Sequence, residues 1–218
     1  MFEAIIKIGG SLYHQPQLKR SLQLWSDLAE KYRLLFLPGG GPFTDTVRAT
    51  DARFHLSDSA AHWMAILGME QSAYLLADLT PKAVLVQELA EATAAGEAGR
   101  LAILAPLALF RQMDPLPHSW QVTSDSMAAW LAGYVKARRL VLLKSVAGVY
   151  GFETPGQPPD LLPRISARAL AAYDIVDPYF SQALSPGPEC WLIDGTQPER
   201  LIELLQTGQT KGTQVEQG

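Results

Sequence analysis

The fold is decided by Lys7-Ile8-Gly9-Gly10-Ser11, which comes straight off an apolar run at residues 2–8, and by Pro38-Gly39-Gly40-Gly41-Pro42, which follows the next apolar run at 34–37. Glycines let backbone N–H groups converge on an anion, and a helix that begins just after them adds the positive end of its dipole. The two turns therefore predict phosphate chemistry. Because a P-loop places its lysine after the glycines, the lysine-first order disfavours a Walker-type NTPase.

Short apolar runs alternate with helical patterns along the whole chain. The runs 2–8 and 34–37, with the amphipathic stretch 16–32 between them, predict a β-α-β unit with parallel strands and a right-handed crossover. Further strands are predicted at 83–86, 101–104, 140–143, 190–193 and, as a closing edge strand, 212–215; further helices are predicted at 44–53, 57–79, 126–136, 166–173 (with Ser166 as N-cap) and 198–206. The pattern is typical of one soluble α/β domain.

Composition narrows the class of protein. With 218 residues, 48% of them hydrophobic, the chain can bury a substantial core in one domain. The net charge of −4 is spread along the sequence, which argues against a nucleic-acid surface. Cys190 is the single cysteine and reads as a buried strand residue. No apolar run is long enough for a membrane span and no basic segment leads into an apolar signal core, so we expect a cytoplasmic protein without membrane contact.

Two further strings complete a family pattern: Val122-Thr123-Ser124-Asp125-Ser126 and Leu143-Lys144-Ser145-Val146-Ala147-Gly148-Val149-Tyr150. With the two glycine turns, they make nearly the whole chain resemble the amino acid kinase superfamily. The resemblance implies a three-layer αβα sandwich with a mainly parallel central sheet. It also implies an acceptor-binding lobe at 1–117 and an ATP-binding lobe at 118–218, divided at the Pro-rich connection 113–117.

The resemblance also implies how the phosphoryl group is held. Lys7 and Lys144 would neutralise the transferring phosphoryl group, and Asp125 would hold both ammonium groups, so these three are the predicted catalytic residues. The predicted ATP-binding residues are Lys7, Gly9, Gly10, Ser11, Lys144, Gly148, Val149 and Tyr150. Two alternatives stay open: Asp125 as a first-turn carboxylate of a helix capped by Ser124, and Lys144 as an ordinary strand-end lysine.

The acceptor is expected at the second glycine turn and the helices after it. The predicted acceptor-binding residues are Gly39, Gly40, Gly41, Asp45, Arg48, His62, Thr123 and Ser124. His62 shares a helical face with Ile66, Met69, Ala73 and Leu76, so a buried core histidine is the alternative to a donor for the acceptor phosphate. Arg48 has a solvated arginine as its alternative, and Asp45 a simple partner of the helix dipole.

Four more segments narrow the resemblance: residues 61–65, 118–126, 174–180 and 193–200. They are similar to the phosphate kinases of methanofuran biosynthesis, which use MgATP to convert a small phosphorylated substrate, a furan-methyl monophosphate, to its diphosphate. The aminomethyl cation of that substrate is a candidate partner for Asp45. Asp174 and Asp177 are candidates to orient Mg²⁺ through water, the alternative being plain surface carboxylates. A homodimer or higher homo-oligomer is expected from the resemblance and the apolar helix at 57–79.

Two positions depart from the family pattern. Ala147 stands where the superfamily often has aspartate, which puts nucleotide preference and turnover in question, and Asp194 stands where relatives often carry asparagine. Two other functions stay open: a kinase of isopentenyl phosphate, UMP or an amino-acid carboxylate, and a non-catalytic nucleotide- or oxyanion-binding protein. The Gly/Pro-rich stretch 152–159 is predicted as a loop, and whether it closes over ATP is left open. The five tryptophans are read as core or interface residues in preference to stacking platforms, with a ring contact left open for one of them.

Overall fold

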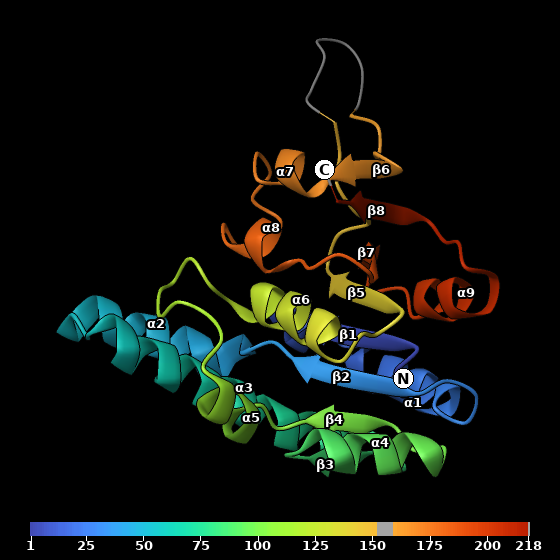
Figure 1. Ribbon diagram of the computed structural model, residues 1–218, viewed down its shortest axis with the longest axis horizontal. Coiled ribbons are helices and arrows are strands. Elements are labelled where there is room, and N and C mark those ends of the chain that lie inside the picture. The colour runs from blue at the N-terminus through green and yellow to red at the C-terminus, as the bar shows by residue number, and fades with distance from the viewer. Residues whose placement is uncertain (152–158, 218) are drawn as a thin grey trace.

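A computed structural model describes residues 1–151 and 159–217, and these residues contain a single eight-stranded sheet. The strand order is β3-β4-β2-β1-β5-β7-β8-β6, which Figure 1 shows from β3 at the bottom to β6 at the top. All neighbouring strands are parallel except β7 and β8. The strands are β1 (Ala4–Ile8), β2 (Leu34–Pro38), β3 (Val84–Val86), β4 (Ala102–Leu104), β5 (Arg139–Lys144), β6 (Arg164–Ser166), β7 (Glu189–Asp194) and β8 (Gly212–Glu216).

Helices cover both faces of this sheet, so the predicted α/β sandwich is confirmed. One hydrophobic core lies between the sheet and α4 to α8, and the other between the sheet, α1 and α9; α3 contributes to both. The helices are the 3-10 helix η1 (Gly10–His14), α1 (Leu18–Leu28), α2 (Gly41–Phe54), α3 (Asp58–Leu79), α4 (Leu89–Glu97), α5 (Leu107–Met113), α6 (Ser124–Tyr134), α7 (Ala167–Leu170), α8 (Phe180–Ala183) and α9 (Glu199–Thr207).

The central strands explain why the sequence shows unbroken apolar runs. Every residue of β1 and β2 is buried, because a parallel strand covered by helices on both faces has no solvent side. Lys7 is the last residue but one of β1 and is only 4% exposed. A buried ammonium group needs a compensating charge. A lysine at this buried position therefore indicates a functional site at this end of the sheet.

The chain order places a ligand site at the carboxyl end of β1. From β1 the chain continues to β2 on one side, while β5, from the second half, lies on the other side. Such a switch point in a parallel sheet leaves a crevice beyond the strand ends, where ligands bind. Residues 1–117 contribute β3, β4, β2 and β1, and residues 118–218 contribute the other four strands, so the two halves meet at this crevice.

Some predicted elements are corrected. Strand β8 is not an edge strand: it lies between β7 and β6, and the edge is the three-residue β6, which is too short to give a periodic signal. Helices α4 and α5 were not predicted, although Glu88 and Glu91 form a capping box at the start of α4. Ser166 does cap α7, accepting a hydrogen bond from the Ala169 amide. Most of the predicted loop 152–159 lies outside the described residues.

Among the described helices, none combines the length and the apolar composition that crossing a membrane requires.

Candidate active site

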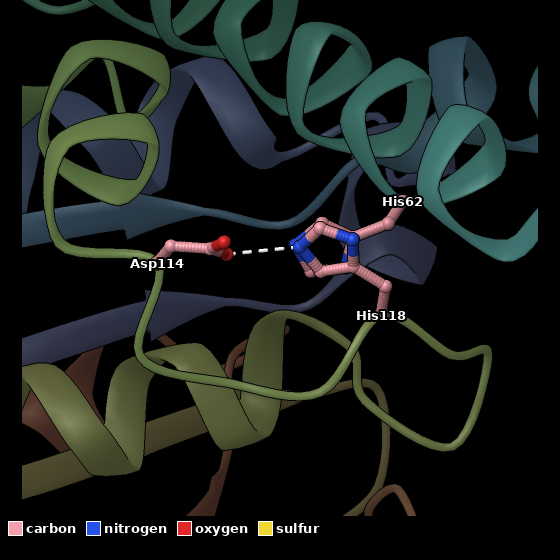
Figure 2. Close-up of side chains that lie close together, drawn as sticks. All are labelled: His62, Asp114 and His118. Carbon is pink, nitrogen blue, oxygen red and sulfur yellow. Dashed lines mark hydrogen bonds and ion pairs between the residues drawn. The ribbon is translucent and has the colours of Figure 1, made fainter.

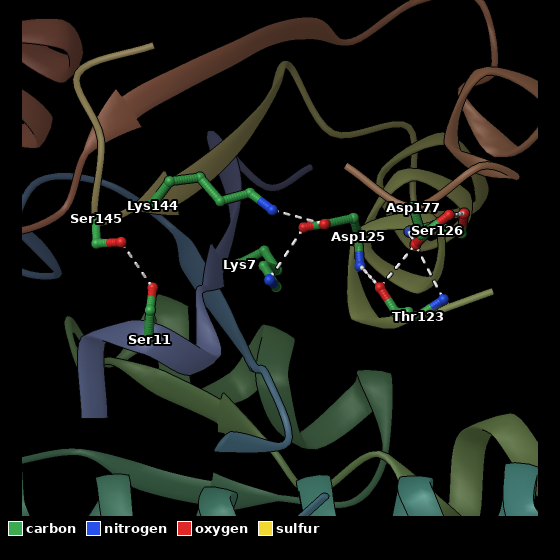
Figure 3. Close-up of polar contacts among 8 residues, drawn as sticks. All are labelled: Lys7, Ser11, Thr123, Asp125, Ser126, Lys144, Ser145 and Asp177. Carbon is green, nitrogen blue, oxygen red and sulfur yellow. Dashed lines mark hydrogen bonds and ion pairs between the residues drawn. The ribbon is translucent and has the colours of Figure 1, made fainter. Parts of the chain in front are cut away.

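One carboxylate joins two lysines at the carboxyl ends of the central strands. The ammonium group of Lys7 lies 3.0 Å from Oδ1 of Asp125, and Lys144 Nζ donates a hydrogen bond of 2.6 Å to Oδ2. Lys7 comes from β1, Lys144 from the end of β5 and Asp125 from the first turn of α6 (Figure 3). We call these three residues the clamp. The structure thus brings together the three residues predicted to be catalytic.

Burial and mutual charge set the protonation of the clamp. Desolvation lowers the pKa of Lys7 from 10.5 to about 8, and the charge of Lys144 acts in the same direction, while Asp125 opposes both. Burial alone would raise the pKa of the Asp125 carboxyl, but the two ammonium groups outweigh it and hold that pKa below its usual value. At neutral pH the clamp therefore carries two positive charges and one negative charge.

The first turn of α6 is fixed by a second carboxylate. Asp177, which is 8% exposed, accepts hydrogen bonds from the amide and hydroxyl of Thr123 at 2.9 and 2.8 Å, and from the amide of Ser126 at 3.0 Å. The Ser126 hydroxyl donates to its other oxygen. Thr123, not Ser124, is the N-cap of α6. Both oxygens of Asp177 are thus engaged, which does not fit the predicted role at Mg²⁺, and Asp174 is exposed.

The two glycine turns pack against strand ends so closely that side chains would collide. The Gly9 amide donates to the Leu143 carbonyl at 2.9 Å, and a Cβ at Gly9 would lie 2.6 Å from that oxygen. The Gly39 amide donates to the Ile8 carbonyl at 2.8 Å, and its Cβ would lie 2.7 Å away. These glycines allow backbone-to-backbone contact between neighbouring strand ends. Their own amides are used in the contact and are not free for an anion.

The amides that can face an anion belong to the residues just after these two glycines. Gly10 and Ser11 begin η1, and Gly41 begins α2, so their N–H groups have no partner within a helix. Gly41 adopts a φ of +52°, and the buried Ser72 hydroxyl donates to the Gly40 carbonyl at 3.0 Å, which fixes the turn from beneath. Both turns therefore present N–H groups at helix starts, the arrangement that suits phosphate.

A cavity of about 440 Å³ opens beside the two turns, a size suited to a small organic molecule. Gly10, Gly40 and Gly41 of the two glycine turns are part of its lining, the buried side chains of the lining are mostly apolar, and Asp45, Arg48 and Asp58 are exposed. The lining includes seven of the eight predicted acceptor residues, Gly40, Gly41, Asp45, Arg48, His62, Thr123 and Ser124, but not Gly39. Sequence reasoning missed His14, Thr44, Asp58, Ala61, Ala65, Ile66, Met69, Ser119, Trp120, Val122 and Met127.

Trp120 and two side chains of α2 form one wall of this cavity. The guanidinium of Arg48 lies 4.1 Å from the centre of the Trp120 ring, and the indole N–H of Trp120 donates to Asp51 at 2.6 Å. Arg48 is thus held over an aromatic face, in a cation–π contact. Trp120 lines the cavity and is only partly buried, so of the two readings it fits the ring contact that was left open for one tryptophan better than a place in the core.

His62 lines the cavity and belongs to a polar and aromatic cluster. Its side chain is half-buried, so it is not a core residue. Its ring stacks on His118, with centroids 4.3 Å apart and planes inclined by 16°. His118 contacts Asp114 through Nε2 at 2.9 Å (Figure 2). Its Nδ1 lies 2.8 Å from the Ser59 hydroxyl. Burial, with a contribution from His118, lowers the pKa of His62 to about 4, so His62 is neutral at physiological pH.

His62, Asp114 and His118 bring three potential metal-ligand atoms within 4.8 Å of one another. The stacked rings lie in nearly parallel planes, and a ring nitrogen binds a metal in the plane of its ring. In addition, both nitrogens of His118 already have hydrogen-bond partners. The cluster is therefore better described as a stacked and hydrogen-bonded group, of which His62 lines the cavity, than as a formed metal centre.

The predicted nucleotide residues lie on both sides of the clamp. The Ser11 hydroxyl donates to the Ser145 hydroxyl at 3.0 Å and so links the first glycine turn to the end of β5. Gly148 has a φ of +152°, and a Cβ there would lie 2.5 Å from the Thr213 hydroxyl oxygen. The Val149 amide donates to that hydroxyl at 2.9 Å. Gly148, Val149 and Tyr150 do not line the cavity described above, whereas Gly10 and Ser11 do.

Comparison of the sequence with known protein families gives the family of this chain. A model of the amino acid kinase family matches residues 3–185. The chain belongs to the amino acid kinase family. Together with the relatives below, this membership identifies it as an ATP-dependent phosphotransferase.

One characterised relative is similar over nearly the whole chain. It is the [5-(aminomethyl)furan-3-yl]methyl phosphate kinase of Methanocaldococcus jannaschii, 29% identical over 204 residues, which cover 93% of this chain and 92% of the relative. The similarity to the family and to this group of kinases, which the sequence motifs predicted, is thus confirmed.

Solved structures of kinases share the fold. Uridylate kinase from Archaeoglobus fulgidus superposes with a TM-score of 0.76 at 18% identity, covering 98% of this chain and 100% of that one. A product complex of T. acidophilum isopentenyl phosphate kinase gives a TM-score of 0.61 at 17% identity, covering 98% of this chain and 99% of that one. At such low identity the two structures support the fold alone.

Proposed function

We propose that this kinase transfers the γ-phosphoryl group of ATP to the phosphate of a small phosphomonoester and so forms a diphosphate. The observation that carries the proposal is the clamp: two ammonium groups held by one carboxylate, beneath two anion-binding turns and beside a cavity. Phosphoryl transfer is catalysed mainly by positioning and by neutralising charge. The clamp supplies charge of the needed sign where two negatively charged phosphates must approach each other.

The proposal divides the roles between the two glycine turns and the clamp. The acceptor phosphate would bind at the amides of Gly40 and Gly41, with the rest of the acceptor in the cavity. ATP would supply the phosphoryl group from the side of Gly10 and Ser11, and Lys7 and Lys144 would lie between the two anions. A phosphate oxygen is already ionised at neutral pH, so the acceptor needs no general base. This agrees with a clamp that contains no group suited to accept a proton at neutral pH.

The cofactor set is MgATP, a proposal that rests on family membership. The amides at the starts of η1 and α2, with the two lysines, fit phosphate oxygens. Mg²⁺ generally keeps several waters and binds through substrate phosphates, so it does not require a dedicated cage of protein ligands.

The acceptor we propose is [5-(aminomethyl)furan-3-yl]methyl phosphate, the substrate in the name of the Methanocaldococcus relative. The cavity supports a flat, compact acceptor with a cationic end. The buried side chains of its lining are mostly apolar, and Asp45 and Asp58 are exposed carboxylates of the same lining. Among the described residues neither of these two carboxylates takes part in an ion pair, so both can receive an ammonium group. With this acceptor, the proposal assigns the chain to the biosynthesis of a methanofuran-type cofactor.

A homodimer or higher homo-oligomer is part of the proposal. Leu67, Tyr74 and Leu75 on α3 are exposed apolar side chains that contact between copies would cover. The molar mass in solution, by light scattering, tests this assembly.

The function is tested by ADP release with MgATP and a panel of acceptors: the furan-methyl phosphate, isopentenyl phosphate, UMP and acetylglutamate. Turnover with the furan-methyl phosphate alone is the expected result. A preference for another acceptor would replace the substrate and keep the clamp. ATP binding without turnover on any acceptor would favour a binding protein of the same fold. Lys7→Met is the control, and it should abolish turnover while the protein stays folded.

A further inference from the structure

The loop between α7 and α8 is hydrogen-bonded to the first turn of α6, which carries Asp125. Asp177 lies in this loop and accepts from Thr123 and Ser126, the residues two positions before and one position after Asp125 (Figure 3). The Tyr179 amide donates to the Gln121 carbonyl at 3.2 Å, in the same pair of segments. The backbone around Asp125 is therefore held on both sides by one buried side chain from about 50 residues further along the chain.

The bonding of Asp177 is denser than capping requires. A helix N-cap oxygen ordinarily accepts from one backbone amide, whereas Asp177 accepts from two amides and two hydroxyls. Its carboxylate is buried, and a buried negative charge is costly unless other charges and donors compensate it. The nearby positive charges are those of the clamp. Together, Lys7, Lys144, Asp125 and Asp177 form a group with two positive and two negative charges.

We propose that Asp177 is a positioning residue of the phosphoryl-transfer site: it fixes the backbone at 123–126, so that Asp125 holds both lysines, and it adds a second negative charge near the two ammonium groups. The proposal rests on the proposed function, because it assigns Asp177 to the same reaction. It replaces the magnesium role that the sequence suggested for this residue. Asp177 itself touches neither the cavity nor the lysines.

The charge effect can be separated from the packing effect by pH. The groups that act on Lys7 are Asp125 on α6, Lys144 on β5 and Asp177, whose charge raises the pKa of Lys7. Cys190 on β7 is also near Asp125, and burial raises its pKa, so it stays neutral. Without the charge of Asp177, the pKa of Lys7 falls below about 8. More of the enzyme then loses the Lys7 charge at mildly alkaline pH.

The test is the pH profile of kcat/KM for MgATP in wild type and Asp177→Asn, since this parameter reports groups of the free enzyme. We expect the alkaline limb of the variant to move to lower pH by half a unit or more, and the loss to be several-fold larger at pH 8.5 than at pH 6.5. Asp177→Glu, which keeps the charge, should restore the position of the limb. Glu91→Gln, a matched change at the capping box of α4, should alter neither limb nor rate.

Two results would overturn the proposal. One is an Asp177→Asn profile that coincides with wild type; the other is a loss of equal size at every pH, which is what a purely structural cap predicts. If Asp177→Asn does not fold, Ser126→Ala removes one of the four hydrogen bonds and should lower kcat about three- to ten-fold, from the loss of positioning. Wild-type kcat in Ser126→Ala would then refute the proposal.

A failure of the proposed function has a different signature. It is seen in the wild type, as absence of ADP release with every acceptor. In that case the pKa of Lys7 is measured directly by ¹³C NMR of protein labelled at lysine Cε, with the resonance assigned by its absence in Lys7→Met. A lower pKa in Asp177→Asn than in wild type supports the role of Asp177 toward Lys7, and an unchanged pKa refutes it.

Discussion

Replacing Lys7 by methionine should reveal how much stability the clamp costs. The pKa of Lys7 falls from 10.5 to about 8 in the folded protein, chiefly because the ammonium group is buried. At about 1.4 kcal/mol for each pKa unit, the charged form weakens the folded state by about 3 kcal/mol. Below pH 8 both folded and unfolded chains hold this proton. Between pH 8 and 10.5 the unfolded chain holds it more often, so stability rises with pH.

The measurement is the free energy of unfolding in urea from pH 7 to 10.5, for wild type and Lys7→Met. The difference between the two, wild type minus variant, should increase by about 3 kcal/mol over this range. Tyr13 and Cys190 also titrate here, and because burial raises their pKa values, they destabilise the fold as pH rises. Both proteins contain these two groups, so their contribution cancels in the difference.

Lys19→Met, at an exposed lysine of α1, is the control and should give a flat difference. A flat or falling difference for Lys7→Met would refute the reasoning, because it would mean that Lys7 is not desolvated in the folded protein. At pH 7 the variant should be the more stable protein and the inactive one. Such a residue is retained for function at the expense of stability.

Three other predictions concern the clamp and the cavity. Asp125→Asn leaves the two ammonium groups without a carboxylate; it should cost about 3–5 kcal/mol in urea unfolding at pH 7 and lower kcat, and unchanged stability would contradict the buried ion pairs. Gly40→Ala would place a Cβ 1.6 Å from the Thr44 hydroxyl oxygen, so kcat/KM for the acceptor should fall by about 10²-fold. Gly96→Ala on α4 is the control and should not change this parameter. Equal values for the two variants would exclude the turn from acceptor binding. Because the pKa of His62 is about 4, this side chain should not titrate between pH 6 and 7, so the pH profiles of acceptor kcat/KM for wild type and His62→Gln should have the same shape in that range. An inflection that is present in wild type and absent in His62→Gln would show that His62 gains a proton there.

Sequence reasoning succeeded where the signal is local. The unbroken apolar runs of β1 and β2 follow from burial on both faces, and each glycine turn directly follows its strand. The three clamp residues lie at the carboxyl end of a strand or at the start of a helix, positions that the residue pattern and the family resemblance could identify. Their convergence then follows from the topology, since β1 and β5 are neighbours.

The parts that were missed depend on contacts between distant segments. Asp177 lies more than 50 residues from the helix start that it holds, and its sequence context is that of a surface loop carboxylate. The five tryptophans were read together as core or interface residues with one ring contact left open, and the place of Trp120 in the cavity lining depends on its contacts with Arg48 and Asp51 of α2. The position of β8 inside the sheet depends on β6, which has only three residues.

The clamp has a consequence for how this protein moves. Its two lysines lie on β1 and β5, neighbouring strands of the buried centre of the sheet, and the glycine turns are tied to the ends of β5 and β1 by backbone hydrogen bonds. Segments of this kind exchange their amide hydrogens only when the whole molecule opens, whereas helices at the periphery open by local fluctuation. We therefore expect the backbone that carries the two lysines to stay in place during the proposed reaction, and the movement that admits and releases substrates to belong to outer elements such as α2.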